Sequence, residues 1–81
     1  MERRVAVIGI GIEDRESAAQ KVNAVLSQHG EAVVGRLGIP YRERKVSVIA
    51  LIVDATTDEL GALTGKLGRI PGVRVKSAVM I

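Results

Sequence analysis

Two stretches of this chain are apolar on both faces of an expected strand. Residues 3–12 (RRVAVIGIGI) and 45–54 (KVSVIALIVD) lack the polar alternation of a strand with one face in water. Because successive side chains point to opposite sides, both faces of each strand need cover. We therefore expect these two stretches to be neighbours in the middle of one sheet.

Two helices are predicted from apolar positions that recur at intervals of three and four residues. The first spans residues 15–29, with Asp14 as its N-cap and Gly30 as its stop. The second begins at the T-x-x-E capping box of residues 56–59 and ends at Gly68. Their apolar stripes consist of Ala18, Val22, Val25 and Leu26 in the first helix and Leu60, Leu63 and Leu67 in the second.

The two remaining strands carry features of sheet edges. Residues 31–39 (EAVVGRLGI) are interrupted by glycine and arginine, which discourage further pairing. Residues 73–81 begin with valine alternating with arginine and lysine, as in a half-exposed strand. Residues 38–44 form a connection short enough for an antiparallel hairpin.

The order of elements predicts a ferredoxin-like βαββαβ sandwich of class α+β. Right-handed crossovers and a central hairpin give a four-stranded antiparallel sheet with two helices on one face, in a single domain of residues 1–81. The uncovered face would leave an apolar patch larger than a small monomer usually exposes. We therefore expect a homo-oligomer, either a dimer or a tetramer.

Contacts between copies are assigned to four residues. Ile49 and Leu51 come from one parity set of the central strand, and Gly61 and Gly65 lie one turn apart on the second helix. A glycine inside a helix costs about 1 kcal/mol relative to alanine. We therefore expect another backbone to approach the helix closely at these glycines.

The amino-acid composition excludes several kinds of catalytic and metal site. The 81 residues include no cysteine and one histidine, so disulfides, thiolate catalysis and cysteine-ligated iron–sulfur clusters are excluded. His29 is interpreted as a helix cap, and no acidic residue completes a metal site with it. The serines have no base at a recognisable spacing. We predict no catalytic residue, no metal and no cofactor.

The sequence also lacks the features needed to bind nucleotides or nucleic acids, or to cross a membrane. Gly9 and Gly11 begin a dinucleotide-like loop, but Asp14 stands where its third glycine belongs. The central strands carry valine, isoleucine and glycine where RNA-recognition domains stack bases on aromatic residues. No apolar run approaches the about 18 residues of a membrane helix. A net charge of +3, with basic and acidic residues interspersed, indicates a solvated surface. With no secretory cleavage site and no membrane helix expected, we predict a cytoplasmic protein.

Three segments together resemble a known family: residues 35–49 (GRLGIPYRERKVSVI), 54–68 (DATTDELGALTGKLG) and 72–79 (GVRVKSAV). They are similar to iron-only hydrogenase system regulators, which are ferredoxin-like domains akin to ACT domains and to the ligand-sensing half of nickel-responsive regulators. The resemblance implies a non-enzymatic regulatory domain that oligomerises and binds a small molecule between subunits. The histidine and cysteine ligands of the nickel-responsive relatives have no counterparts here.

The resemblance also locates a ligand site near the loop after the first strand. In this chain the site would comprise Gly9, Gly11, Ile12, Glu13 and Asp14, with Tyr41, Arg42 and Arg44 as a polar rim. The effector is an unidentified small molecule, and a protein partner is an alternative. Two rival hypotheses stay open: a purely structural or protein-interaction module, and a small enzyme whose site is completed at a subunit interface.

Overall fold

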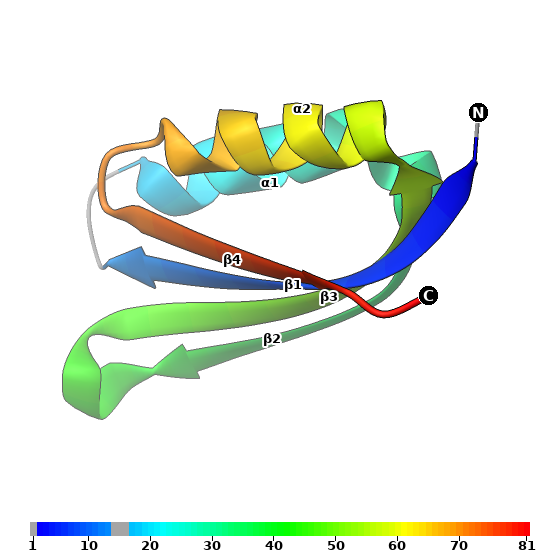
Figure 1. Cartoon of the computed structure of the whole chain (residues 1–81). Coiled ribbons are helices and arrows are strands. Elements are labelled where there is room, and N and C mark those ends of the chain that lie inside the picture. The colour runs from blue at the N-terminus through cyan, green and yellow to red at the C-terminus, as the bar shows by residue number, and fades with distance from the viewer. Residues whose placement is uncertain (1, 14–16) are drawn as a thin grey trace.

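Four strands and two helices form two layers, with both helices on one side of the sheet (Figure 1). The computed structural model describes residues 2–13 and 17–81. The elements are β1 (Arg3–Glu13), α1 (Ala18–Gln28), β2 (Val33–Tyr41), β3 (Val46–Thr56), α2 (Thr57–Gly68) and β4 (Val73–Val79). All neighbouring strands are antiparallel and follow the order β2-β3-β1-β4, so the predicted ferredoxin-like fold is confirmed.

The core lies between the sheet and the helices. Ala6, Ile8, Ile10 and Ile12 of β1 and Ile49, Leu51, Val53 and Ala55 of β3 are buried on the helix side. The predicted leucine stripe of α2 and Ala18, Val22 and Leu26 of α1 pack onto this side. Neither helix is long and apolar enough to cross a membrane, within the residues that the structure describes.

The β2–β3 hairpin is longer than the sequence indicates. A 3₁₀ turn at Gly30–Ala32 delays the start of β2, and the strand then continues to Tyr41 through residues predicted as loop. Pro40 fits here because β2 is an edge strand. The true connection is the 3₁₀ turn Arg42–Arg44, which the left-handed Lys45 (φ 54°) closes.

The other element boundaries differ from the sequence predictions by a few residues. β3 runs two residues past the predicted end, to Thr56, and β4 ends at Val79. The predicted N-cap Asp14 lies outside the described residues. In the described chain α1 begins at Ala18 and is followed by His29 at its C-cap, where the backbone N–H of His29 donates to the carbonyl of Leu26.

The predicted capping box begins α2. The N–H of Glu59 donates to Thr56 Oγ1 over 3.2 Å, and the N–H of Thr56 donates to Glu59 Oε1 over 3.0 Å. The hydrogen bond from the Thr56 backbone, helped by the Thr56 side chain, holds the pKa of Glu59 below its ordinary value of 4.5. The carboxylate therefore stabilises the helix start in its charged form.

The hydrogen bond between the Thr56 backbone and the Glu59 carboxylate should stabilise the fold to a degree that depends on pH. Because folding lowers the pKa of Glu59, its contribution is complete above pH 4.5 and disappears as the pH falls through the lowered pKa. We expect Glu59→Gln to lower the melting temperature at neutral pH and to match the wild type in strong acid. Melting curves from pH 2 to pH 8 test this, with Asp58→Asn as the neighbouring control. A difference that does not vary with pH would contradict it.

Candidate functional site

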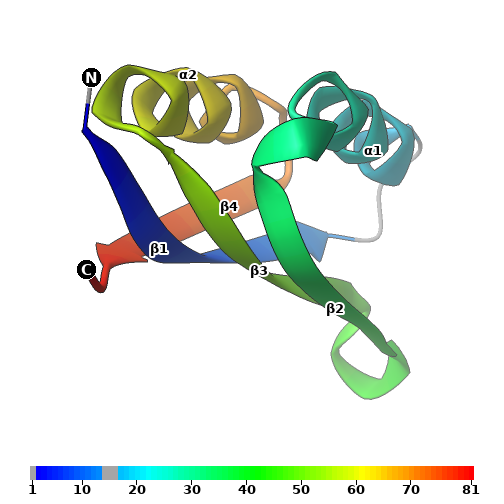
Figure 2. The same cartoon turned by 90° about the vertical axis from the view of Figure 1, so that its right-hand side faces the viewer.

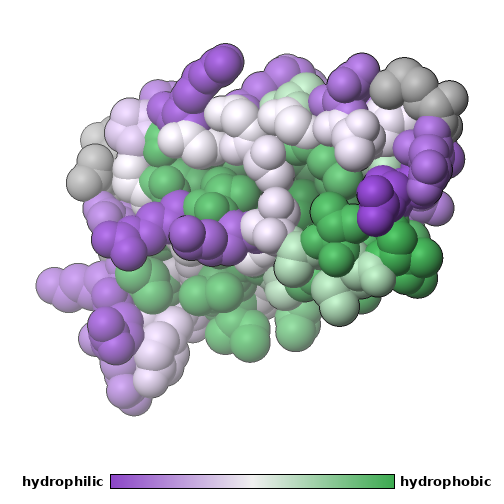
Figure 3. Space-filling model, in the orientation of Figure 1, coloured by the Kyte–Doolittle hydropathy of each residue, from purple (hydrophilic) through white to green (hydrophobic). Residues whose placement is uncertain are grey.

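The side of the sheet away from the helices, here called the open face, is mostly apolar. Six large apolar residues on this face are between 39% and 63% exposed: Val7, Leu37, Ile39, Tyr41, Val48 and Ile52. Hydrophobic surface is visible below the strands in Figure 3, on the side opposite the helices. The sequence prediction of an uncovered apolar face is therefore correct.

The residues assigned from the sequence to contacts between copies do not lie on this face. Ile49 and Leu51 are 7% and 0% exposed because their side chains point into the core beneath the helices. That assignment was wrong, since the open face carries the other parity set of β3. Gly61 and Gly65 lie on the exposed surface of α2, with no atom of this chain within 4 Å of an added Cβ.

A cavity of about 350 Å³ lies at one end of the open face. We call it the Arg44–Arg74 cavity. It forms where β1 ends, β3 begins and the turn at Gly72 leads into β4. Its lining consists of Gly11, Ile12, Glu13, Arg44, Val46, Val48, Gly72 and Arg74. Four of the predicted ligand residues therefore come together here, namely Gly11, Ile12, Glu13 and Arg44.

Backbone pairing holds the walls of this cavity. The N–H of Glu13 donates to the carbonyl of Gly72 over 2.8 Å, which ties the end of β1 to the turn before β4. Gly72 has a φ of 82°, a conformation that favours glycine. Arg74 lies directly opposite Gly11 in the β1–β4 register, so its side chain stands beside the glycine on the open face.

The charges of the cavity suit an anionic ligand. Within the described chain, neither the Arg44 nor the Arg74 side chain makes a hydrogen bond or an ion pair. The ion pair of the described residues joins Arg3 Nε to Asp54 Oδ1 at 3.1 Å, near the start of β1 and away from the cavity. Val46 and Val48 add an apolar wall, so the cavity can hold a small molecule that is partly apolar.

Three of the other predicted ligand residues, Gly9, Tyr41 and Arg42, lie outside this cavity. Gly9 is on the open face two residues before Gly11, and Tyr41 lies opposite Val46 at the end of β2. Asp14 falls outside the described residues. Sequence reasoning missed Gly72 and Arg74, and the signal that could have found Arg74 is the pairing of β4 with β1.

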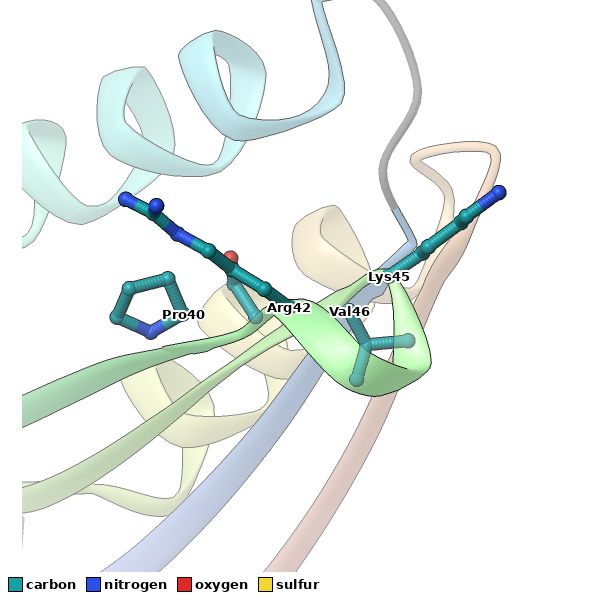
Figure 4. Close-up of a pocket in the computed structure, with 5 residues that line it drawn as sticks. Pro40, Arg42, Lys45 and Val46 are labelled. Atoms are coloured by element: carbon teal, nitrogen blue, oxygen red, sulfur yellow. The ribbon is translucent and has the colours of Figure 1, made fainter.

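Arg42 lines a different hollow of about 330 Å³, together with Pro40, Lys45, Val46 and Ser47. Figure 4 shows the side chains of Arg42 and Lys45 pointing away from one another. The two positive groups therefore do not converge on one anion, and this hollow is a weaker ligand site.

His29 connects the two helices. Its Nε2 lies 3.2 Å from Lys66 Nζ, and Lys66 also reaches Gln28 Oε1 over 3.4 Å. Among residues 2–13 and 17–81, no three His, Cys, Asp or Glu side chains form a group that could hold a metal ion. The contacts of Lys66 with His29 and Gln28 therefore connect the end of α1 to α2 and do not form a metal site.

Comparison with known proteins identifies the family. The family model described as "TM1266-like: Iron-only hydrogenase system regulator, putative" matches residues 4–77. The uncharacterized protein TM1266 from Thermotoga maritima is 41% identical, covering 99% of this chain and 100% of that chain, and its structure gives a TM-score of 0.96. The chain belongs to this TM1266-like family. No curated protein matches it.

More distant structures share the fold of this TM1266-like protein. The ACT domain from the GTP pyrophosphokinase of Chlorobium tepidum gives a TM-score of 0.81 at 22% identity, covering 95% of this chain and 100% of that chain. The regulatory subunit of aspartate kinase from Thermus flavus gives 0.57 at 22% identity, covering 96% of this chain and 57% of that chain. The TM1266-like chain therefore has an ACT-like fold.

Proposed function

We propose that this TM1266-like protein is a non-enzymatic sensor that self-associates and binds a small anionic molecule in the Arg44–Arg74 cavity. The observation that carries the proposal is the pair of arginines without side-chain partners, beside an apolar wall and above Gly11. A ligand carboxylate or phosphate would supply the acceptors that the guanidinium groups lack in the described chain.

The shape of the cavity supports a ligand of modest size. Its volume of about 350 Å³ lies near the lower end of the range for small-molecule sites. The lining combines the two arginines with the apolar side chains of Val46 and Val48, so it offers both a basic part and an apolar part. A small, partly apolar metabolite with an acidic group is the class that fits best.

The arrangement supports binding better than catalysis. The lining contains two arginines, one glutamate and apolar or glycine residues, without histidine, serine or lysine. A nucleophile beside an oriented base, the usual arrangement for covalent catalysis, is missing from this lining. Sensing requires only that the ligand prefer one state of the protein, which such a cavity can achieve.

Thermal-shift measurements test the proposal. We expect one member of a panel of amino acids, small carboxylates, mononucleotides and inorganic phosphate to raise the melting temperature in a concentration-dependent way. A ligand at one hundred times its Kd stabilises the folded state by about 2.7 kcal/mol. Arg44→Ala and Arg74→Ala should each weaken the shift at least tenfold in ligand concentration.

Arg42→Ala is the matched control, because it removes an arginine from the same turn but from outside the cavity. It should leave the shift unchanged. If no compound in the panel shifts the melting temperature, or if Arg42→Ala abolishes the shift as Arg44→Ala does, the cavity is not the sensor site. The purely structural alternative would then be favoured.

A further inference from the structure

We propose that two copies pack open face to open face about a two-fold axis running along β3. In this dimer the partner subunit closes the Arg44–Arg74 cavity. The inference rests on the proposed self-association and adds to it the surface, the axis and the residues that meet.

The strands lie side by side in the order β2, β3, β1, β4 (Figure 2). Their registers arrange the side chains of the open face in rows that run across the sheet. The rows are Gly35–Ile52–Val7–Ala78, Leu37–Ala50–Gly9–Lys76, Ile39–Val48–Gly11–Arg74 and Tyr41–Val46–Glu13. In the second and third rows a bulky residue on β2 and a glycine on β1 lie on either side of β3. The first row reverses this order.

A two-fold axis along β3 places β2 of one copy over β1 of the other at the same row. Leu37 of the partner subunit then lies over Gly9, and Ile39 of the partner subunit lies over Gly11. In the first row Val7 lies over the partner's Gly35. Each of these bulky side chains therefore meets a position without a side chain, which is the complementarity that close packing requires.

The two glycines of β1 are not explained by packing within one copy. A Cβ at Gly9 would come no nearer than 4.0 Å to another atom, and one at Gly11 no nearer than 3.9 Å, so this chain has room for a side chain at both positions. Glycine inside a strand weakens the strand and often marks the close approach of something else. The partner's β2 supplies that close approach.

The basic residues of β4 select this axis over the alternative. An axis perpendicular to the strands that passes between the second and third rows would place Gly9 over Gly11 of the partner subunit and Arg74 over Lys76 of the partner subunit. Such an arrangement leaves a void and a repulsion. With the axis along β3, β4 extends past the partner's β2, and its basic residues stay in water at the margin.

The same packing brings partner residues to the cavity. In the fourth row Tyr41 of the partner subunit lies over Glu13, and in the third row Ile39 of the partner subunit lies over Gly11. Both Gly11 and Glu13 line the cavity. Ligand binding and dimerisation are therefore linked, and a bound ligand should tighten the dimer.

Two substitutions test the proposed packing. The first fills the space over Gly11, and the second removes the partner side chain that occupies this space in the dimer. Gly11→Val should weaken dimerisation at least tenfold without unfolding the chain, because its own surroundings accept a side chain. Adding Ile39→Ala should restore affinity toward the wild type, whereas adding Leu37→Ala should not. Sedimentation equilibrium measures the dimer Kd, and circular dichroism checks the fold.

Gly61→Val is the control, since it adds the same side chain on the exposed surface of α2, and it should leave the Kd unchanged. If the wild type dimerises but Gly11→Val has no effect, or if both double variants behave alike, this packing is overturned while self-association stands. If Gly61→Val dissociates the dimer instead, α2 is the contact. A wild type that stays monomeric at 0.1 mM, with and without ligand, overturns the packing and the proposed self-association together.

Discussion

Replacing Leu51 by alanine is expected to lower the free energy of unfolding by about 2–5 kcal/mol, enough to unfold much of the protein at 37 °C. Leu51 is fully buried at the centre of β3 and belongs to the core between the sheet and the helices. The cost combines lost burial with the cavity that remains, because strands on both sides prevent β3 from moving inward. Chemical denaturation followed by circular dichroism measures the change.

Leu37→Ala is the matched control for Leu51→Ala. It removes the same atoms from β2, but from a side chain that is 63% exposed in a single copy. In dilute solution, where copies are separate, its effect should stay below about 1 kcal/mol, as for most exposed positions. Equal losses for the two variants would mean that the helices do not cover the face that carries Leu51.

Local patterns predicted the elements of this fold well. The capping box at Thr56 and Glu59 depends on residues three positions apart, so it can be recognised without tertiary information. The end of β2 was misplaced because glycine and Pro40 are typical of loops, whereas an edge strand accommodates both. Whether such residues end a strand depends on its place in the sheet.

The site was less predictable because it depends on contacts between distant segments. Parity shows that both faces of β3 are apolar, but it does not show which face the helices cover, so Ile49 and Leu51 were assigned to the wrong side. Gly11 and Glu13 were expected at the site through the family resemblance, and Arg44 was expected at its polar rim. Arg74 reaches Gly11 only through the β1–β4 register, which the turn at Gly72 fixes.

The dimer gives the open face a single explanation for three separate features. One packing arrangement fits all three features. The face is apolar, Gly9 and Gly11 leave room above β1, and the basic residues Arg74 and Lys76 lie at its margin on β4. A monomeric sensor would account for the cavity but would leave the bulky residues of β2 exposed. The position of Ala50 is where this arrangement can be disrupted most directly.

Ala50→Asp is expected to weaken the dimer at least a hundredfold, which corresponds to about 2.7 kcal/mol. Ala50 lies between Leu37 and Gly9 in its row, so on the proposed axis it faces the same residue of the partner subunit. Two carboxylates would be removed from water and would face each other, and an unpaired buried charge costs about 3–5 kcal/mol. Light scattering across a concentration series measures the loss of dimer.

Ala62→Asp makes the same change on α2, at an exposed position away from the open face, and should leave the dimer intact. Because Ala50 is outside the Arg44–Arg74 cavity, the Ala50→Asp monomer should still bind ligand, but more weakly, since the partner's Tyr41 no longer covers the cavity. A dimer of unchanged affinity in Ala50→Asp would contradict open-face packing, because no isologous contact centred on β3 can accommodate two buried aspartates without that cost.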